Sequence, residues 1–382
     1  RVRGVFMKID NVVLIIGGGT GGHISPGIAL YEEANRRNIG VKFLAGGRDR
    51  RFKYLNDIDK EDLLFYSAPK LTRNIFKLPF FVLSFLWALL HIRYIVKKHG
   101  ITDVVGMGGY VSAPALLSLA RSGIRLWLCE QNTVPGKVTS MFARHAVKIF
   151  TTFDDTKDYI REDYRTKIEC VGNPVRKRVL PEIPKEEARR RFNMEQCDKV
   201  ILAIGGSQGA RQISELVLEL KMTYQKQFRQ IGIIWSTGAD YYEHYCSIIH
   251  SDDKQGFVYL SPFIEDVGVA YNAADIAISR SGSGVMMELA AMKLPSILIP
   301  YPYAAMDHQN KNADVFDRSG AAIKVTGDKV TAAYIGPMIF DILGSETRLR
   351  QMQRKCAQEA RIHAAEDILN AIVRRDEYAV SK

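Results

Sequence analysis

A run of five apolar residues followed by a cluster of glycines constrains the fold more than any other feature of the sequence. Residues 12–16 are all Val, Ile or Leu, and residues 17–22 read Gly-Gly-Gly-Thr-Gly-Gly. A short apolar run stopped by glycine predicts a buried parallel strand that enters a tight turn. Residues 24–37 have helical composition, with Pro26 where a first helical turn tolerates it. The stretch therefore predicts a strand–turn–helix unit whose backbone N–H groups form an anion site.

A second copy of this pattern begins near the middle of the chain. Residues 200–204 form another apolar run, and Gly205-Gly206-Ser207-Gln208-Gly209-Ala210 follows it. Other short apolar runs alternate with segments of helical composition, which is typical of parallel α/β sheets. The sequence therefore predicts two α/β domains, each with a phosphate-binding turn. The other predicted strands include 41–44, 103–105, 126–129, 231–235, 257–259, 276–278 and 296–300.

Length and cysteine usage favour a two-domain cytoplasmic protein. The 382 residues are 47% hydrophobic, enough for two cores. The five cysteines are scattered without a Cys-x-x-Cys pair, which argues for a reducing compartment and against a zinc site. Because the first predicted strand begins at residue 12, we expect no secretory leader. A passage rich in Gly and Pro at 172–184 predicts domains at 1–175 and 176–355, with a helical segment at 356–382 that packs back on the first domain.

The positive charge of the chain is concentrated in its first half. The formal net charge is +11, and residues 1–176 carry 27 Lys and Arg against 16 Asp and Glu. No basic stripe with interleaved aromatic residues is present, so we expect no nucleic-acid partner. The surplus fits an anionic membrane surface, a phosphate-bearing ligand or a merely soluble basic face.

The most hydrophobic part of the chain lies within this basic half. Residues 78–92 contain no formal charge, and basic residues flank them on both sides, at 70–77 and 93–98. Fifteen uncharged residues fall short of the ~20 that a membrane-spanning helix needs. Such a segment is either an ordinary core helix or a helix that lies in the lipid headgroups. With the charge, it predicts that residues 71–98 contact an anionic membrane surface.

Several kinds of cofactor chemistry are disfavoured. The spacing Gly17-x-Gly19-x-x-Gly22 fits a dinucleotide-binding turn, but the second strand ends in glycines and then Arg48, without the acidic ribose partner. The missing acid argues against an NAD site and leaves only weak support for an NADP site. The sequence has no P-loop, no His/Cys cluster with metal spacing and no hydrolase elbow. We expect neither metal nor cofactor, so backbone N–H groups, Ser and Arg would neutralise a diphosphate.

Polar residues follow several predicted strands, where ligands bind in open α/β sheets. Glu130 and Asn132 end one strand, and each is either a ligand contact or a cap. In the second half, Ser283 is a candidate N-cap for a helix at 285–293, and Glu288 lies near its amino end. That carboxylate is placed to accept from a ribose diol or to complement the helix dipole. The amide-rich segment 307–312 suits the uncharged hydroxyls of a sugar.

Together these segments resemble one family, the MurG UDP-N-acetylglucosamine transferases of peptidoglycan synthesis, which are GT-B glycosyltransferases. Seven stretches match in family order across nearly the whole chain. The resemblance implies two Rossmann-like domains whose parallel sheets face each other across a cleft. The matching stretches are Gly18-Gly19-Thr20-Gly21-Gly22-His23, Gly106-Met107-Gly108-Gly109-Tyr110-Val111-Ser112, Glu130-Gln131-Asn132, Gly172-Asn173-Pro174-Val175-Arg176, 205–210, Arg280-Ser281-Gly282, and Gln309 with Asn312-Ala313.

The resemblance implies an inverting transfer of N-acetylglucosamine from UDP-GlcNAc to the C4 hydroxyl of the muramoyl sugar of lipid I, which forms lipid II. The enzyme would be peripheral, at the cytoplasmic face of the inner membrane, with the 75–92 patch as its docking surface. By matching positions, Thr20, Gly21 and Gly22 lie at the donor–acceptor junction. Ser207 binds the donor diphosphate, and Ile264 contacts the uracil through its backbone. Glu288 binds the ribose, and Gln309 contacts the sugar hydroxyls. The other implied substrate-binding residues are Tyr110, Asn132, Arg176, Gln208, Arg280, Ser283, Gly284, Val285, Met286, Met287 and Asn312.

Inverting transfer needs a base, for which His23 is the first candidate and Glu130 the second. A helix N-terminus disfavours imidazolium and so keeps a ring at His23 able to accept a proton; the competing interpretation is that His23 only positions the turn. The glycine turn at 17–22 then belongs to the acceptor side, facing the lipid diphosphate.

Cys129 stands where family members commonly carry His. The rival functions are a UDP-GlcNAc 2-epimerase, an NADP-dependent oxidoreductase and a non-enzymatic binding protein.

Overall fold

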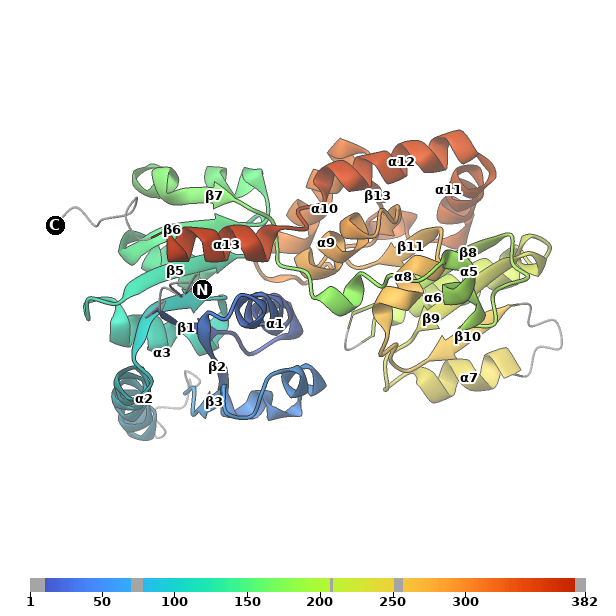
Figure 1. Cartoon of the computed structure of the whole chain (residues 1–382). Helices are drawn as coiled ribbons and strands as arrows, with labels where there is room; N and C mark the ends of the chain where they lie inside the picture. Colours follow the sequence, from blue (N-terminus) through green and yellow to red (C-terminus); the bar gives the residue numbers. More distant parts are fainter. Residues whose placement is uncertain (1–10, 70–77, 207–208, 251–256, 375–382) are drawn as a thin grey trace, which may run out of the picture. The chain divides into compact units, whose positions relative to one another are not determined.

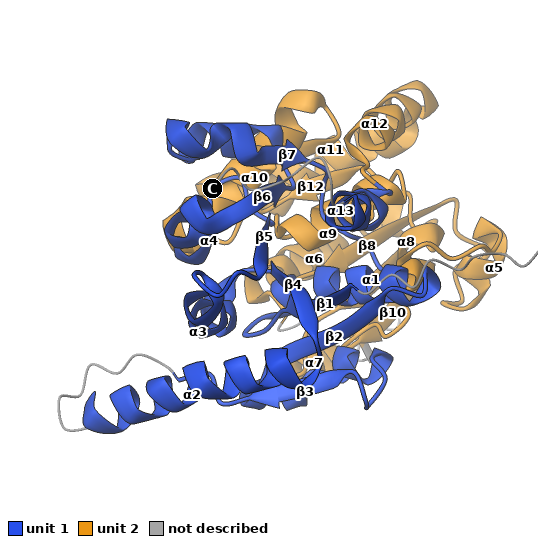
Figure 2. Cartoon of the chain, turned by 60° about the vertical axis from the view of Figure 1, so that its left-hand side comes forward, with its two compact units in different colours: residues 1–176, 362–382 blue, residues 177–361 orange. Residues whose placement is uncertain are grey.

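The computed structural model describes residues 11–69, 78–206, 209–250 and 257–374 (Figure 1). The chain divides into two compact units, shown in different colours in Figure 2. Unit 1 comprises residues 1–176 and 362–382, and unit 2 comprises residues 177–361. Each unit holds one sheet in which every pair of neighbouring strands is parallel, so the prediction of two α/β domains is confirmed.

The sheet of unit 1 has the strand order β3-β2-β1-β4-β5-β6-β7. Alternate residues of β1 are buried on opposite faces: Val13 and Ile15 join one core cluster, while Leu14 and Ile16 join the other. A strand covered on both faces needs apolar side chains throughout, which explains the unbroken run in the sequence. The strands are β1 (Val12–Ile16), β2 (Gly40–Gly46), β3 (Leu63–Tyr66), β4 (Ile101–Gly106), β5 (Arg125–Glu130), β6 (Ala146–Thr151) and β7 (Ile168–Cys170).

Helices cover both faces of this sheet. Ile24 and Ile28 of the first helix pack with Ile368 and Ile372 of the last helix on one face, so the end of the chain completes the core of unit 1. The second and third helices pack together on the other face. The helices of unit 1 are α1 (Gly21–Arg36), α2 (Leu78–Lys98), α3 (Gly109–Leu119), α4 (Lys137–Phe142) and α13 (Ala364–Val373).

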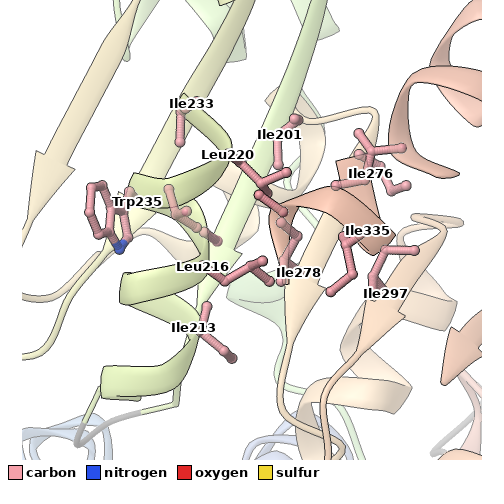
Figure 3. Packing of buried hydrophobic residues seen from close by; sticks show 14 of the residues in the cluster. Ile201, Ile213, Leu216, Leu220, Ile233, Trp235, Ile276, Ile278, Ile297 and Ile335 are labelled. Atoms are coloured by element: carbon pink, nitrogen blue, oxygen red, sulfur yellow. The ribbon is translucent and has the colours of Figure 1, made fainter. Parts of the chain in front are cut away.

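Unit 2 repeats this architecture with the strand order β10-β9-β8-β11-β12-β13. Figure 3 shows Leu216 and Leu220 of α6 packed beside Ile201 and Ile278 of the central strands. The strands are β8 (Lys199–Ile204), β9 (Ile231–Ser236), β10 (Val258–Ser261), β11 (Ile276–Ser279), β12 (Ser296–Leu298) and β13 (Ala322–Lys324). The helices are α5 (Lys185–Arg190), α6 (Arg211–Thr223), α7 (Tyr242–His250), α8 (Val267–Ala273), α9 (Ser283–Ala291), α10 (His308–Ser319), α11 (Ala332–Gly344) and α12 (Glu346–Glu359).

A buried carboxylate fixes the amino-terminal edge of the unit 2 sheet. Asp275 immediately precedes β11 and accepts hydrogen bonds from Val200 N at 2.7 Å, Lys185 Nζ at 2.6 Å and Arg189 Nη2 at 2.7 Å. These contacts join β8, β11 and α5. Because Asp275 is only 5% exposed, loss of its partners would leave a buried charge without compensation.

Strand order defines a topological switch point in the sheet of each unit. In unit 1 the chain passes outward through β2 and β3 and then returns to the other side of β1 with β4. In unit 2 it passes through β9 and β10 and returns beside β8 with β11. Ligands of open α/β sheets bind at such a switch point, beyond the carboxyl ends of the strands. The glycine turns after β1 and β8 are both at these points.

Candidate substrate site

In unit 1, His23 lies between the turns that follow β1 and β4. It is the third residue of α1, and its Nδ1 is 2.9 Å from Thr20 Oγ1. Gly108 and Gly109 have φ values of +85° and +74°, and a Cβ at these positions would lie 3.3 Å from His23 Nε2 and 3.0 Å from its Nδ1. The turn after β4 thus needs glycine both for its backbone conformation and for its contact with the imidazole.

The other predicted residues of the unit 1 glycine turn (residues 17–22) gather around this histidine. Thr20 and Gly22 are exposed, and Gly21 is partly buried at the start of α1. The ring of Tyr110 lies against Gly19, where a Cβ would be 2.9 Å from its Cε1. The structure therefore brings Thr20, Gly21, Gly22, His23 and Tyr110 into one cluster at the predicted end of the sheet.

Asp49 holds the glycine turn in place, a role that the sequence pattern did not predict. It is 2% exposed, and its Oδ1 accepts the Gly19 N–H at 3.0 Å while its Oδ2 accepts the Gly46 N–H at 2.9 Å. The prediction of a bare anion-binding turn is therefore wrong at Gly19, because a protein carboxylate already occupies that N–H group. The signal in the sequence is an acid three residues after Gly46, the last residue of β2.

Glu130 holds the loop that follows β5. The carboxylate is buried and accepts from Asn132 N at 3.0 Å, Gly136 N at 2.9 Å and Thr139 Oγ1 at 2.5 Å. Burial raises the pKa of Glu130, and these hydrogen bonds oppose the rise. A buried carboxylate that accepts three such bonds is poorly placed to take a substrate proton, so we assign Glu130 to positioning Asn132 rather than to catalysis.

Cys129 precedes this carboxylate at the end of β5. Its side chain is buried, and burial together with the Glu130 carboxylate raises the pKa of the thiol far above its usual range. A thiol in this environment stays protonated and packs as a small apolar group. Cys129 therefore takes no acid–base role.

Arg176, the last residue of unit 1 before the chain enters unit 2, is a buried guanidinium. It is 4% exposed and stacks over the Tyr54 ring at 5.1 Å, and its Nη1 is 3.7 Å from Asp57 Oδ2. Its Nε and Nη1 have no hydrogen-bond acceptor within the described residues. Tyr54 also approaches Gly21, whose added Cβ would be 3.7 Å from the ring. Unmatched buried donors beside the glycine turn suit an anionic ligand group.

Unit 2 carries a second, partly buried guanidinium, directly after β11. Arg280 follows β11, and its Nη1 donates to Gln212 Oε1 at 3.0 Å, Ile299 O at 3.0 Å and Pro300 O at 3.2 Å. All of these partners, within the part of the chain described, are neutral, and burial lowers the pKa of Arg280 from its ordinary value. The guanidinium therefore supplies net positive charge beside the turn after β8. The predicted Ser207 and Gln208 of that turn lie outside the described residues.

Helix α9 begins one residue earlier than the capping prediction required. Gly282 occupies the N-cap position and Ser283 is the first helical residue, so Ser283 is not the cap. Glu288 is half-buried, and its Oε2 accepts the Tyr271 hydroxyl at 2.8 Å. Gly284 and Val285 are also partly exposed, but Met286 and Met287 are buried. The side chains of these two methionines pack in the interior, and their predicted place in the nucleotide site stays a prediction.

The amide residues of α10 hold the turn after β11. Gln309 Oε1 accepts Tyr301 N at 2.9 Å, and Gln309 O accepts Ser281 Oγ at 2.8 Å. Asn312 is fully buried and donates to Ser281 O at 3.2 Å. Asn312 thus holds this turn in place, and its predicted contact with the substrate stays a prediction. The buried Ile264 follows β10 in the loop before α8.

Metal ligation and membrane spanning are two further properties that the structure addresses. Within the described residues no cluster of three His, Cys, Asp or Glu is arranged to hold a metal ion. Helix α2 is long and apolar enough to cross a membrane by length and composition alone. It connects β3 to β4, however, and both strands belong to the same sheet, so α2 stays on one side of any membrane.

Comparison with known proteins identifies the class and then the family. Residues 13–151 match the glycosyltransferase family 28 N-terminal domain, and residues 200–368 match its C-terminal domain. The fold and its two glycine turns are thus those of a two-domain glycosyltransferase of family 28. The chain belongs to the family of UDP-N-acetylglucosamine–N-acetylmuramyl-(pentapeptide) pyrophosphoryl-undecaprenol N-acetylglucosamine transferases.

This membership rests on relatives that match along nearly the whole chain. The Leptospira interrogans transferase is 32% identical over 93% of this chain and 97% of its own length, and the Aquifex aeolicus transferase is 33% identical over 84% and 90%. Acinetobacter baumannii MurG has a TM-score of 0.71 at 24% identity, covering 95% of this chain and 99% of that one. A UDP-GlcNAc 2-epimerase from Neisseria meningitidis, bound to UDP-GlcNAc, has a TM-score of 0.69 at 15% identity, covering 95% and 100%. The two structural matches show the fold alone.

Proposed function

We propose that this protein transfers N-acetylglucosamine from UDP-GlcNAc to the C4 hydroxyl of the muramoyl sugar of lipid I, which forms lipid II. The observation that carries the proposal is the match to transferases of this name along nearly the full length of both proteins. The structure adds two polar clusters at the switch points of two parallel sheets, one around His23 and one around Arg280 and Glu288.

Unit 2 is proposed to bind the donor. Arg280 supplies positive charge for the diphosphate together with Ser207 and backbone N–H groups, and Glu288 accepts hydrogen bonds from the ribose. Gln309 contacts the sugar through the part of its amide that does not accept Tyr301 N. Arg176 and Asn132 are proposed as further donor contacts. Arg176 supports this role because its Nε and Nη1 donate no hydrogen bond within the described residues, and Nη1 has only a longer ion-pair contact with Asp57 Oδ2, at 3.7 Å.

His23 is proposed as the general base. As the acceptor C4 oxygen forms its bond to the anomeric carbon, the proton of that hydroxyl passes to His23 Nε2. The bond between the anomeric carbon and the diphosphate breaks, and its electron pair leaves with UDP, so the configuration inverts. A base at Nε2 requires the proton of the neutral ring to be on Nδ1, where it donates to Thr20 Oγ1 at 2.9 Å.

The exposed surface of α2 is proposed to dock on the cytoplasmic face of the membrane, where the lipid-linked acceptor lies. One face of the helix packs in unit 1 through Ala88, Ile92, Ile95 and Val96, and Ser118 Oγ donates to Leu89 O at 2.8 Å. The other face exposes apolar side chains beside exposed Arg93, Lys97 and Lys98, a pattern typical of interfacial helices. The exposed apolar residues of α2 are Leu78, Phe80, Val82, Leu83, Leu86, Trp87, Leu90 and Tyr94.

A transfer assay tests this function. The purified protein is incubated with UDP-GlcNAc and a short-chain lipid I analogue, and the products are resolved by mass spectrometry. We expect one N-acetylhexosamine to be added to the analogue, with UDP released. A protein that converts UDP-GlcNAc to its C2 epimer without acceptor would instead be an epimerase, and one that binds the donor without turnover would be a binding protein.

A further inference from the structure

A buried tyrosine of unit 2 contacts the carboxylate that we propose for the ribose. Tyr271 lies on α8 and is 2% exposed, and its hydroxyl donates to Glu288 Oε2 on α9 at 2.8 Å. Glu288 itself is half-buried. Both residues belong to unit 2, so their relationship is internal to one compact body.

The chemistry of the pair suits positioning rather than simple packing. A buried phenol needs a hydrogen-bond partner, and a carboxylate is the strongest acceptor that a side chain offers. Glutamate has three rotatable bonds, and recognition of a ribose diol requires its carboxylate plane to be set before the ligand arrives. A hydroxyl that binds one oxygen from within the protein body fixes that plane.

We propose that Tyr271 is a positioning residue for the donor, one that holds the Glu288 carboxylate in the orientation that accepts the ribose hydroxyls of UDP. The inference rests on the proposed function, because it assumes that Glu288 meets the ribose. Tyr271 touches neither the donor nor the reacting atoms. Its contribution is therefore to donor affinity, and it acts only through Glu288.

Tyr271→Phe tests this role because it removes only the hydroxyl. We expect KM for UDP-GlcNAc to rise roughly two- to tenfold, the effect of leaving one flexible side chain unrestrained before binding, with kcat unchanged. Tyr245→Phe is the matched control. Tyr245 is likewise a buried tyrosine of unit 2, but its ring packs against Trp235, so its KM should stay at the wild-type value.

A donor analogue separates positioning from a general structural effect. Each variant is assayed with UDP-GlcNAc and with its 2′,3′-dideoxyribose analogue, and the ratio of the two kcat/KM values is compared. Both donors are measured on one preparation, so any loss of folded protein cancels from the ratio. We expect the wild-type and Tyr245→Phe proteins to prefer the natural donor by at least roughly tenfold. Tyr271→Phe should lose much of this preference.

The outcomes distinguish the inference from the function beneath it. If the wild-type protein does not discriminate between the donors, the proposed contact between Glu288 and the ribose is wrong. If the wild type discriminates and Tyr271→Phe keeps the same ratio, the positioning role is overturned. A third comparison uses Glu288→Ala, in which a further Tyr271→Phe change should have no effect on KM. An additional rise in that background would also contradict a role through Glu288.

Discussion

The Asp49 carboxylate accepts the backbone N–H of Gly19 at 3.0 Å and so ties the turn after β1 to the turn after β2. Gly19 has a φ of +85°, and the next residue, Thr20, occupies the N-cap position of the helix that carries His23. The position of His23 therefore depends on the Asp49 carboxylate through the backbone of the turn. The Asp49 hydrogen bond and the Tyr110 ring, which packs against Gly19, both hold this residue at its positive φ.

Replacing Asp49 with Ala should reduce both stability and turnover. The buried Gly46 N–H and the partly buried Gly19 N–H lose their acceptor, at a cost of up to about 1–3 kcal/mol each in free energy of unfolding. Urea unfolding measures the first effect, and kcat at saturating donor measures the second. The exposed Asp328, changed to Ala, is the control and should alter neither. A wild-type kcat in folded Asp49→Ala protein would show that the turn needs no such support.

Thr20 should matter through its hydroxyl. Thr20→Val removes the partner of His23 Nδ1 while keeping the shape of the side chain, and Thr20→Ser keeps the hydroxyl. We expect kcat to fall roughly three- to tenfold in the valine variant, the effect of losing one hydrogen bond. It should change little in the serine variant. Steady-state kinetics at saturating substrates measures both. Equal kcat values in the two variants would contradict a role of Thr20 in orienting the ring.

Asp275 should contribute to stability without affecting the site. Asp275→Ala leaves Lys185 and Arg189 without their buried carboxylate, so the free energy of unfolding should fall by about 3 kcal/mol or more. Asp266→Ala disrupts an exposed pair with Arg191 and should cost less than about 1 kcal/mol. Chemical denaturation measures both values. Because Asp275 lies at the opposite end of β11 from Arg280, KM for the donor should not change in the folded variant; an altered KM would argue against this separation.

The exposed face of α2 should control membrane binding. Trp87 and Leu86 are 56% and 51% exposed, and changing both to Ser removes apolar surface worth about 1.5–3 kcal/mol per side chain when buried. Binding to vesicles that contain anionic phospholipid, measured by co-sedimentation, should fall at least roughly tenfold and should weaken further with salt. Tyr334→Ser, an exposed aromatic residue of unit 2, is the control. Unchanged vesicle binding in the double variant would exclude α2 as the docking surface.

The strand–turn–helix units could be predicted from sequence because local signals and burial agree. The apolar run at 12–16 is buried on both faces of the sheet, and the glycines after it form the turn that the sequence predicts. The boundaries of α9 were less accurate, since glycine rather than Ser283 takes the N-cap position.

The support around the site was harder to predict, because it depends on contacts between strands far apart in sequence. Asp49 reaches Gly19 across 30 positions, and Tyr271 reaches Glu288 from a different helix. Nothing in the local pattern of Asn312 distinguishes a sugar contact from a buried amide that holds the turn at Ser281. A sequence pattern locates the ends of the strands, whereas the tertiary structure decides which polar side chain is left to face a ligand.

The most direct test of the account is the effect of His23 on the chemical step. Single-turnover transfer to the lipid I analogue is measured with both substrates saturating, for the wild type, His23→Ala and Glu130→Gln. The account predicts that His23→Ala slows transfer by about 10²- to 10⁴-fold, the range for loss of a general base, with donor affinity retained. Glu130→Gln, which keeps a side chain of the same size, should lower the rate far less. A near-normal rate in His23→Ala together with a lost rate in Glu130→Gln would contradict the account.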